Sequence, residues 1–289
     1  MNPLVKWSFT AIGTEWSVET DSPLSKDEQT SVTQIIEMFE QVYSRFRADS
    51  LVSTIASDGT GDYEFPPSIR ELYSLYLALE EITDGAVNPL VGRSLEQLGY
   101  NAQYSLQSTG AYTPPSLATS TRLENTILHV DEPLLIDIGA IGKGYLADQV
   151  ATIITAGHTE YVVDASGDIA VRRKHPETIG LEDPRDPARV IGIVRLSNLS
   201  LCASATNRRA WGDGLHHVID ARTGQPTDSS IIATWAIAPT TVLADALATA
   251  LFFTSPEKLK SRLGDFYYVT MRRDGSVSHN IEPIGELYV

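Results

Sequence analysis

The chain has 289 residues, of which 42% are hydrophobic and 20% charged, a composition that is ordinary for a globular protein with a sizeable core. Its formal net charge of -15 argues against nucleic acid as a partner, because a phosphate backbone would be repelled, and against a peripheral role on an anionic membrane. No stretch approaches the roughly 18 consecutive apolar residues of a transmembrane helix, so none is expected.

The N-terminal residues and the cysteine content both favour an intracellular protein. Residues 1–7 lack the apolar core and the small-residue cleavage site of a signal peptide. Cys202 is the only cysteine, so an intramolecular disulfide is impossible and a thiolate metal cluster is not expected. Its apolar surroundings predict a buried, inert thiol. We therefore expect a cytoplasmic location, and an exported form with a removed signal is the alternative.

Residues 7–18 predict two strands separated by a bend or bulge at Gly13. A helix is predicted to start at Ser25, where Ser25 and Glu28 have the spacing of a capping box, and to end in a polar segment at 44–50. A second capping box at Ser68 and Glu71 predicts another helix, which stops at Gly85. These two helices supply core.

The segment after the second helix is apolar except for one amide and a proline. Residues 86–92 therefore predict either a turn that lines a pocket or a buried connector. Residues 101–120, rich in Ser, Thr, Gln and Pro, predict a long surface loop. Strands are expected between this loop and residue 136.

A glycine-rich junction follows, over residues 136–145. The apolar run 133–136 predicts a buried strand, and the apolar spacing after residue 145 predicts a helix that ends at Gly157. Gly139, Gly142 and Gly144 are expected to leave backbone N–H groups free at the positive end of the helix dipole, with Lys143 as a nearby cation. A phosphate-bearing ligand near Lys143 is one interpretation, and a tight turn with a surface lysine is equally good on the glycine spacing alone.

The C-terminal half alternates short strands and turns, then a helix. Strands are predicted at 161–171 with a bend at Gly167, at 179–184, 190–196, 231–238 and 266–271, and a helix at 241–253. The polar residues Asp164, Ser166 and Asp168 either shape a ligand edge or satisfy that bend, and Arg208 with Arg209 is more simply a surface pair. The chain is predicted to be α+β, with mixed, largely antiparallel sheets and helices packed on them. Residues 1–289 form either one domain or two tightly packed α/β subdomains.

Asp245 and Thr249 lie one turn apart on a helix that is otherwise rich in Ala and Leu. A buried carboxylate needs a partner, and an adjacent hydroxyl supplies a second oxygen ligand of the kind that Mg²⁺ prefers. The simpler interpretation is that Asp245 serves the dipole of its own helix and Thr249 bonds back to its backbone. Taken alone, that simpler interpretation is the better one.

His217 precedes Val218, Ile219 and Asp220. In a strand, His217 and Ile219 would share one face, so one of the two histidines His216 and His217 should face inward as a general base near neutral pH. A packed histidine without chemistry is the alternative, and no spaced His or Cys cluster supports a transition metal.

Taken together, these segments resemble the ApbE family of FAD:protein FMN transferases. The resemblance runs from Phe9 to about Phe253 and rests on seven segments in the family's order, including DIGAIGKGY at 137–145, HVIDARTG at 217–224 and ADALAT at 244–249. The other four are FTAIGT at 9–14, SRF with DS at 44–50, VNPLVG at 87–92 and DASGDI at 164–169. Ile12 and Asn88 stand where methionine and aspartate are usual, which bears on the fine specificity of the pocket.

The resemblance implies a Mg²⁺-dependent enzyme that cleaves FAD, attaches FMN by a phosphoester to a Thr or Ser of an acceptor flavoprotein, and releases AMP. It implies Asp245, Thr249 and the backbone of Ala140 as metal ligands, and His217 as the base for the acceptor hydroxyl. Positions of the FAD pocket, on the same basis, are Ile12, Phe46, Ala86, Val87, Asn88, Asp137, Lys143 and Ile219.

Two other functions are compatible with the same residues. An FAD pyrophosphatase would release free FMN and AMP by letting water replace the acceptor hydroxyl. A non-catalytic protein would only bind and deliver FAD.

Overall fold

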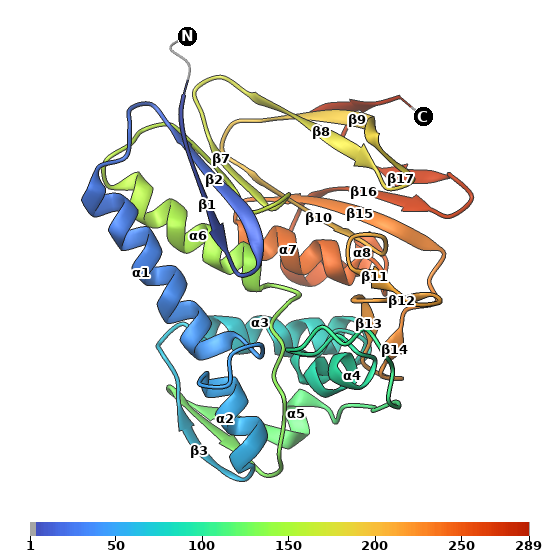
Figure 1. Ribbon diagram of the computed structural model, residues 1–289. Helices are drawn as coiled ribbons and strands as arrows, with labels where there is room; N and C mark the ends of the chain where they lie inside the picture. The colour runs from blue at the N-terminus through green and yellow to red at the C-terminus, as the bar shows by residue number, and fades with distance from the viewer. Residues whose placement is uncertain (1–3, 289) are drawn as a thin grey trace.

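The computed structural model describes residues 4–288, and an eight-stranded antiparallel sheet lies at the centre of its upper part in Figure 1. Every neighbouring pair in this sheet is antiparallel, which confirms the predicted class. In spatial order its strands are β1 (Val5–Ala11), β2 (Thr14–Thr20), β6 (Tyr161–Asp164), β7 (Ile169–Arg172), β10 (Ser200–Ala205), β15 (Ile231–Ala238), β16 (Tyr267–Arg272) and β17 (Val277–His279).

A smaller sheet covers one face of this central sheet. Its strands, in spatial order, are β18 (Gly285–Leu287), β9 (Asp186–Leu196) and β8 (Glu177–Asp183). Leu181 and Ile191 of the smaller sheet belong to the same buried cluster as Trp235 and Val269 of the central one. Burial of this apolar surface between two sheets is what fixes the alternating pattern of their strands.

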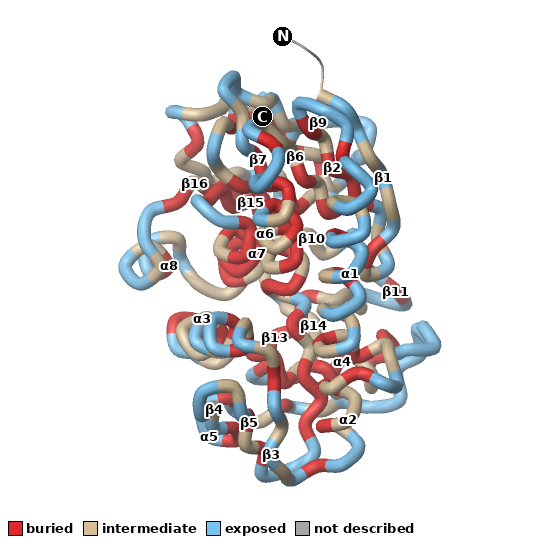
Figure 2. Tube along the Cα trace, turned by 90° about the vertical axis from the view of Figure 1, so that its left-hand side faces the viewer, coloured by how far each residue is buried: buried red, intermediate tan, exposed pale blue. Residues whose placement is uncertain are grey.

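Helices cover the opposite face. They are α1 (Lys26–Tyr43), α6 (Gly142–Thr155) and α7 (Thr241–Ala250), and α7 packs on β10 and β15. The predicted capping box at Ser25 and Glu28 is present at the start of α1. Figure 2 shows that buried residues gather where α6 and α7 meet the sheet. The two helices that carry the candidate residues are therefore held by the core on several sides.

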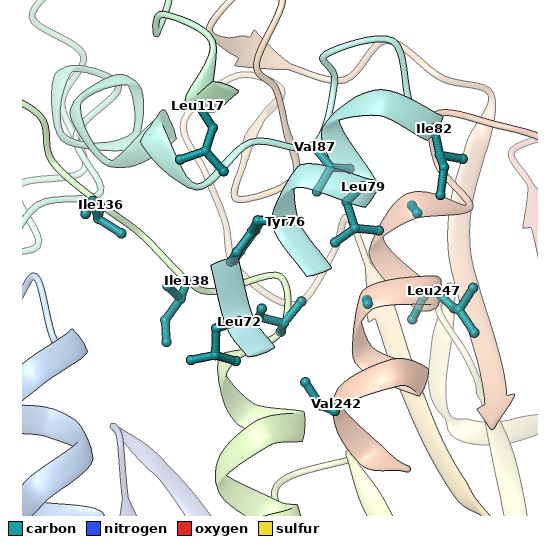
Figure 3. Close-up of a cluster of buried hydrophobic side chains, with 14 of the residues drawn as sticks. Leu72, Tyr76, Leu79, Ile82, Val87, Leu117, Ile136, Ile138, Val242 and Leu247 are labelled. Atoms are coloured by element: carbon teal, nitrogen blue, oxygen red, sulfur yellow. The ribbon is translucent and has the colours of Figure 1, made fainter. Parts of the chain in front are cut away.

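A second group of elements lies below α6 and α7 in Figure 1. Its helices are α2 (Leu51–Asp58), α3 (Ile69–Ile82), η1 (Pro89–Val91), α4 (Gly92–Gln97) and α5 (Leu117–Ser120), and its sheet is β3 (Gly61–Glu64), β5 (Ile127–Val130) and β4 (Thr121–Glu124). The remaining helix, α8 (Pro256–Leu263), lies at the level of α7 and contacts α3. Figure 3 shows how the two groups join: Leu72, Tyr76 and Leu79 of α3 lie near Val242 and Leu247 of α7.

Two short two-stranded sheets complete the structure. They pair β11 (Ala210–Trp211) with β12 (Leu215–His216), and β13 (Ile219–Asp220) with β14 (Gln225–Pro226). Between residues 4 and 288 no helix is both long and apolar enough to cross a membrane. The predicted lack of signal-peptide features concerns a segment whose residues 1–3 lie outside the described residues.

Three local predictions were wrong. Within the run 133–136, Pro133 is exposed and residues 134–136 are buried, but the run belongs to no sheet; instead the N–H of Asp137 bonds to the carbonyl of Pro89 at 2.7 Å. Ser68 forms no capping box, because its backbone is already helical and its hydroxyl contacts the Tyr43 hydroxyl at 3.2 Å. His217 lies in a bend between β12 and β13, so strand alternation does not decide which way it faces.

Candidate active site

The N-terminal end of α6 borders a cavity of about 330 Å³. A second cavity of about 560 Å³ adjoins it and shares part of its lining. The residues common to both are Thr14, Tyr100, Asp137, Gly139, Lys143 and Arg209. The two cavities are therefore neighbours on either side of these residues, Lys143 among them.

Most residues named from the sequence line these cavities. The first is lined by Val87, Asn88, Asp137, Ala140, Lys143, His217, Ile219, Asp245 and Thr249, and the second by Ile12, Phe46, Asp137 and Lys143. Ala86 lines neither; it is fully buried, and its carbonyl accepts a hydrogen bond from the N–H of Ala221 at 3.0 Å. The fold thus brings together side chains from segments that are far apart in the sequence.

The glycine-rich turn does not leave its glycine N–H groups free, contrary to the prediction. The N–H of Gly139 bonds to Asp137, that of Gly142 to the Ile138 carbonyl, and that of Gly144 to the Oδ2 of Asp245, at 2.7, 2.7 and 2.9 Å. Gly144 is required by packing, because a Cβ there would lie 2.4 Å from the Thr241 carbonyl oxygen. The positive charge at this end of α6 therefore comes mainly from Lys143.

Lys143 forms an ion pair with Asp168, a residue with no exposed surface. Burial alone would lower the pKa of Lys143, but the charges of Asp168 and Asp245 outweigh it and raise the pKa above its usual value. The second carboxylate oxygen of Asp168, Oδ1, is buried and has no hydrogen-bond partner among residues 4–288. Lys143 thus stays charged beside two buried carboxylates.

Asp245 and Thr249 both reach the first cavity from α7, as the helical spacing predicts. Burial, together with the charge of Asp168, raises the pKa of Asp245 well above its usual value. Asp245 serves the N-terminus of α6 rather than the dipole of its own helix, since it accepts the Gly144 N–H.

The donor set at this end of the cavity fits Mg²⁺. Asp245 and Thr249 offer oxygen atoms, and the buried Oδ1 of Asp168, whose other oxygen pairs with Lys143, has no hydrogen-bond partner among the described residues. In the part of the chain that the structure describes, no three His, Cys, Asp or Glu residues gather to form a complete metal cage. Few protein ligands, all of them oxygens, are typical of Mg²⁺ sites that are completed by water and substrate phosphates.

His217 lines the first cavity, whereas its neighbour His216 lines neither. Its backbone N–H bonds to the carbonyl of Arg209 at 3.2 Å, and its Nδ1 is buried without a partner among the described residues. Burial, and then the charge of Arg209, lower the pKa of His217 to about 3. Because a desolvated ring resists protonation, His217 is expected to be neutral at pH 7 rather than to titrate near neutral pH, and its role as a base stays a prediction.

An aromatic and arginine-rich wall forms the second cavity. Arg45 is almost completely buried; its Nε donates to the Oδ2 of Asp137 at 2.5 Å, and its guanidinium lies 4.2 Å from the centre of the Phe46 ring. Tyr104 stacks on the same Phe46 ring, with centroids 5.5 Å apart and planes at 10°. Asp137 is thus held by an ion pair, and the Phe46 ring contacts both a guanidinium and a second aromatic ring, a surface suited to a planar ligand.

A family model described as the ApbE family matches residues 12–266. The chain belongs to the ApbE family. Among curated proteins it is similar to the FAD:protein FMN transferase of Escherichia coli (strain K12), with 24% identity over 301 residues covering 96% of this chain and 84% of that protein. It is also similar to that of Treponema pallidum (strain Nichols), with 27% identity over 267 residues covering 81% and 73%. These relatives are enzymes by name.

Solved structures of ApbE proteins share the fold. The ApbE protein of Thermotoga maritima superimposes with a TM-score of 0.83 at 23% identity, covering 96% of this chain and 97% of that one. The flavinyl transferase ApbE of Pseudomonas stutzeri gives 0.77 at 22% identity, covering 96% and 95%. Because both sequences are less than 25% identical to this chain, the structural similarity shows a shared fold and nothing more.

Several residues of this ApbE site were missed by the sequence. Tyr76, assigned to the core, lines the first cavity, and its buried hydroxyl has no partner within residues 4–288. Arg209, taken for half of a surface pair, lines both cavities and lies 5.9 Å from the Tyr100 ring centre. Arg45 stands next to Phe46 in a segment that carried the family resemblance, which was the available signal. Nothing local marked Arg209.

Proposed function

We propose that this chain is an FAD:protein FMN transferase, which cleaves FAD and joins FMN to a Thr or Ser hydroxyl of an acceptor flavoprotein. One observation carries the proposal. Lys143, the Asp245–Thr249 pair and His217 come from three distant segments and line one cavity at the N-terminal end of α6. These are the cation, the metal-binding oxygens and the base that the transfer needs, in a chain of the family whose relatives carry this name.

In this proposal the protein's cations bind the pyrophosphate of FAD. Lys143 and Arg209 line both cavities, so a diphosphate at their junction would meet two positive side chains. Asp245, Thr249 and the backbone of Ala140 would hold Mg²⁺, which supplies charge neutralisation of the phosphates when bound. The remainder of the FAD pocket would be lined by Ile12, Phe46, Val87, Asn88, Asp137 and Ile219. Ala86 is buried next to Val87 and does not reach the cavity.

His217 accepts the proton of the acceptor hydroxyl at a ring nitrogen. The acceptor oxygen forms a new bond to the phosphorus on the FMN side, the bond from that phosphorus to the bridging oxygen breaks, and AMP leaves with that oxygen. A base in this role contributes about 10²–10⁴-fold. With a pKa near 3 the ring is neutral and available at pH 7. A bound phosphate nearby favours the imidazolium, so the pKa should rise as the site fills.

The proposal is tested by co-expression of the chain with a candidate flavoprotein, followed by mass spectrometry of that flavoprotein. The expected result is an added mass of one FMN on a Thr or Ser, which disappears when Asp245→Ala replaces the wild type. A failure of purified protein to label any suitable target in the presence of Mg²⁺ and FAD would contradict the proposal.

The pyrophosphatase alternative shares the whole site, with water in place of the acceptor hydroxyl. Measurement of FMN release from FAD without any acceptor protein separates the two. A rate without acceptor that equals the rate with acceptor would favour hydrolysis.

A further inference from the structure

Helices α6 and α7 cap one another. Asp148, in the second turn of α6, accepts hydrogen bonds from the first two N–H groups of α7, those of Thr241 and Val242, at 2.9 and 2.8 Å. In return Asp245 of α7 accepts the N–H of Gly144, in the first turn of α6, at 2.9 Å. The first N–H groups of a helix have no acceptor within their own helix. Here each helix supplies a carboxylate to those N–H groups of its neighbour.

The first residue of α7 is held from three further directions. The hydroxyl of Thr241 contacts that of Ser200 at 2.9 Å, its carbonyl accepts from the Sγ of Cys202 at 3.4 Å, and Gly144 leaves no room for a Cβ against that carbonyl. Thr241 is completely buried. The start of α7 is therefore located relative to α6 by directional bonds as well as by packing.

The position of Thr241 sets the positions of both candidate metal ligands. Thr241, Asp245 and Thr249 follow each other at intervals of four residues, so they lie along one side of α7 over about 12 Å. A shift of the first turn is passed along this rigid helix to the two side chains that face the cavity. Asp148 itself lines neither cavity, so its effect must be indirect.

We propose that Asp148 is a positioning residue of the transferase: by binding the start of α7 to α6 it holds Asp245 and Thr249 at the distance from Lys143 that Mg²⁺ and the pyrophosphate require. This inference rests on the proposed function for its metal and substrate. A carboxylate suits the role, because two oxygens are needed for two N–H groups that point the same way.

The test compares Asp148→Asn with the matched control Thr240→Ala. An Asn side chain accepts one of the two N–H groups and directs its own NH₂ at the other, so the bond between the helices is weakened without a change in size. Thr240 caps the same end of α7 through Leu243, at 3.4 Å, but makes no bond to α6 in that role. Both substitutions weaken the capping of α7. Only Asp148→Asn also weakens the hydrogen bonds that join α7 to α6.

Three measurements are made on each protein. They are the Mg²⁺ concentration for half-maximal AMP release from FAD in the presence of an acceptor flavoprotein, the rise in thermal midpoint caused by Mg²⁺ with FAD, and the hydrogen-exchange rate of the Gly144 amide. We expect Asp148→Asn to raise the half-saturating Mg²⁺ concentration about 10–100-fold, the usual effect of losing a group that orients a ligand. It should also reduce the thermal rise and speed the exchange, while Thr240→Ala leaves all three near the wild-type values.

The outcomes separate the positioning role from a structural one. If Asp148→Asn only lowers the thermal midpoint and leaves the Mg²⁺ dependence and the Gly144 exchange unchanged, the inference is overturned. If Asp148→Asn does not fold, Asp148→Glu decides: it keeps the charge one methylene further out and should give a smaller shift in Mg²⁺ dependence, whereas no shift overturns the inference. A wild type that binds Mg²⁺ and FAD but neither transfers FMN to an acceptor flavoprotein nor releases AMP would refute the proposed function, and the thermal and exchange measurements would still decide the role of Asp148.

Discussion

Replacement of Gly144 by Ala tests the close contact between α6 and α7. A Cβ at this position would lie 2.4 Å from the carbonyl oxygen of Thr241 and 2.7 Å from the Cβ of Asp245. Ordinary van der Waals contact between a Cβ and another heavy atom begins at a distance near 3.4 Å. The helices must therefore move apart by about 1 Å, and neither neighbour can rotate away because one is backbone and the other is a Cβ.

The expected loss of stability follows from three contributions. Overpacking of a tight contact costs about 1–3 kcal/mol. Stretching the hydrogen bond from the Gly144 N–H to the Asp245 carboxylate costs about 1.5–3 kcal/mol if it is lost completely. Alanine recovers up to about 1 kcal/mol, since glycine is a poorer helix former. The net destabilisation is roughly 2–4 kcal/mol, a large part of the 5–15 kcal/mol typical of a folded protein.

Urea unfolding of Gly144→Ala, compared with Gly142→Ala, measures this loss. The control lies in the same helix, and its added Cβ would meet side-chain carbons alone, those of Ile138 at 3.2 and 3.3 Å, which can shift, and Cζ of Phe39 at 3.5 Å, an ordinary contact. We expect the control to stay within about 1 kcal/mol of the wild type. If Gly144→Ala proves as stable as Gly142→Ala, the contact between the helices is not as close as described and the reasoning fails.

Four other predictions concern three individual side chains. His217→Ala should lower the rate of flavin transfer about 10²–10⁴-fold with little change in the FAD affinity found by titration, and equal losses in both would indicate a structural histidine. Because burial lowers the pKa of His217 to about 3, the pH profile of kcat/KM should lack a histidine inflection near pH 6.5, and the presence of one removed by His217→Ala would contradict that pKa. Asp245→Ala should abolish AMP release from FAD in the presence of an acceptor flavoprotein while FAD retention, followed by flavin fluorescence, stays largely intact; a variant with full turnover would exclude the metal-ligand role. A hydrogen bond from His158, the largest cause, lowers the pKa of Asp21 to about 2 from 3.8, so its contribution to stability is present above about pH 4 and is lost as the pH falls through 2. After allowance for the solvent exposure of Asp21, Asp21→Asn should cost about 1 kcal/mol at pH 5 and almost nothing at pH 2 in urea unfolding, and a pH-independent cost would contradict this.

Elements whose pattern is local were predictable. The strands around Gly13 and Gly167 and the helices that begin at Ser25 and end near Gly157 are present, because side-chain periodicity and turn chemistry act over a few residues. Asp245 and Thr249 share one side of α7 for the same reason. The run 133–136 was wrongly predicted to be a strand. An apolar stretch indicates that its side chains are buried, but it does not indicate which groups its backbone will bond to.

Residues that act through distant partners were not predictable. Arg45 bonds to Asp137, 92 residues away in the chain, and Asp148 bonds to Thr241 across 93 residues. Nothing within either segment indicates which other segment it will meet. The glycine N–H groups near Lys143 looked free for the same reason, since one of their acceptors lies on α7.

The class of the fold, the family and most residue types that line the cavity could be read from the sequence, because these follow from periodicity and from motifs of a few residues. How those residues are used depends on their neighbours in the folded protein. The tertiary structure pairs Lys143 with Asp168, buries His217 until its ring stays neutral, and directs Asp245 to the N-terminus of α6. Charge, pKa and hydrogen bonding depend on what lies within a few ångströms in space, and that neighbourhood exists only once the chain has folded.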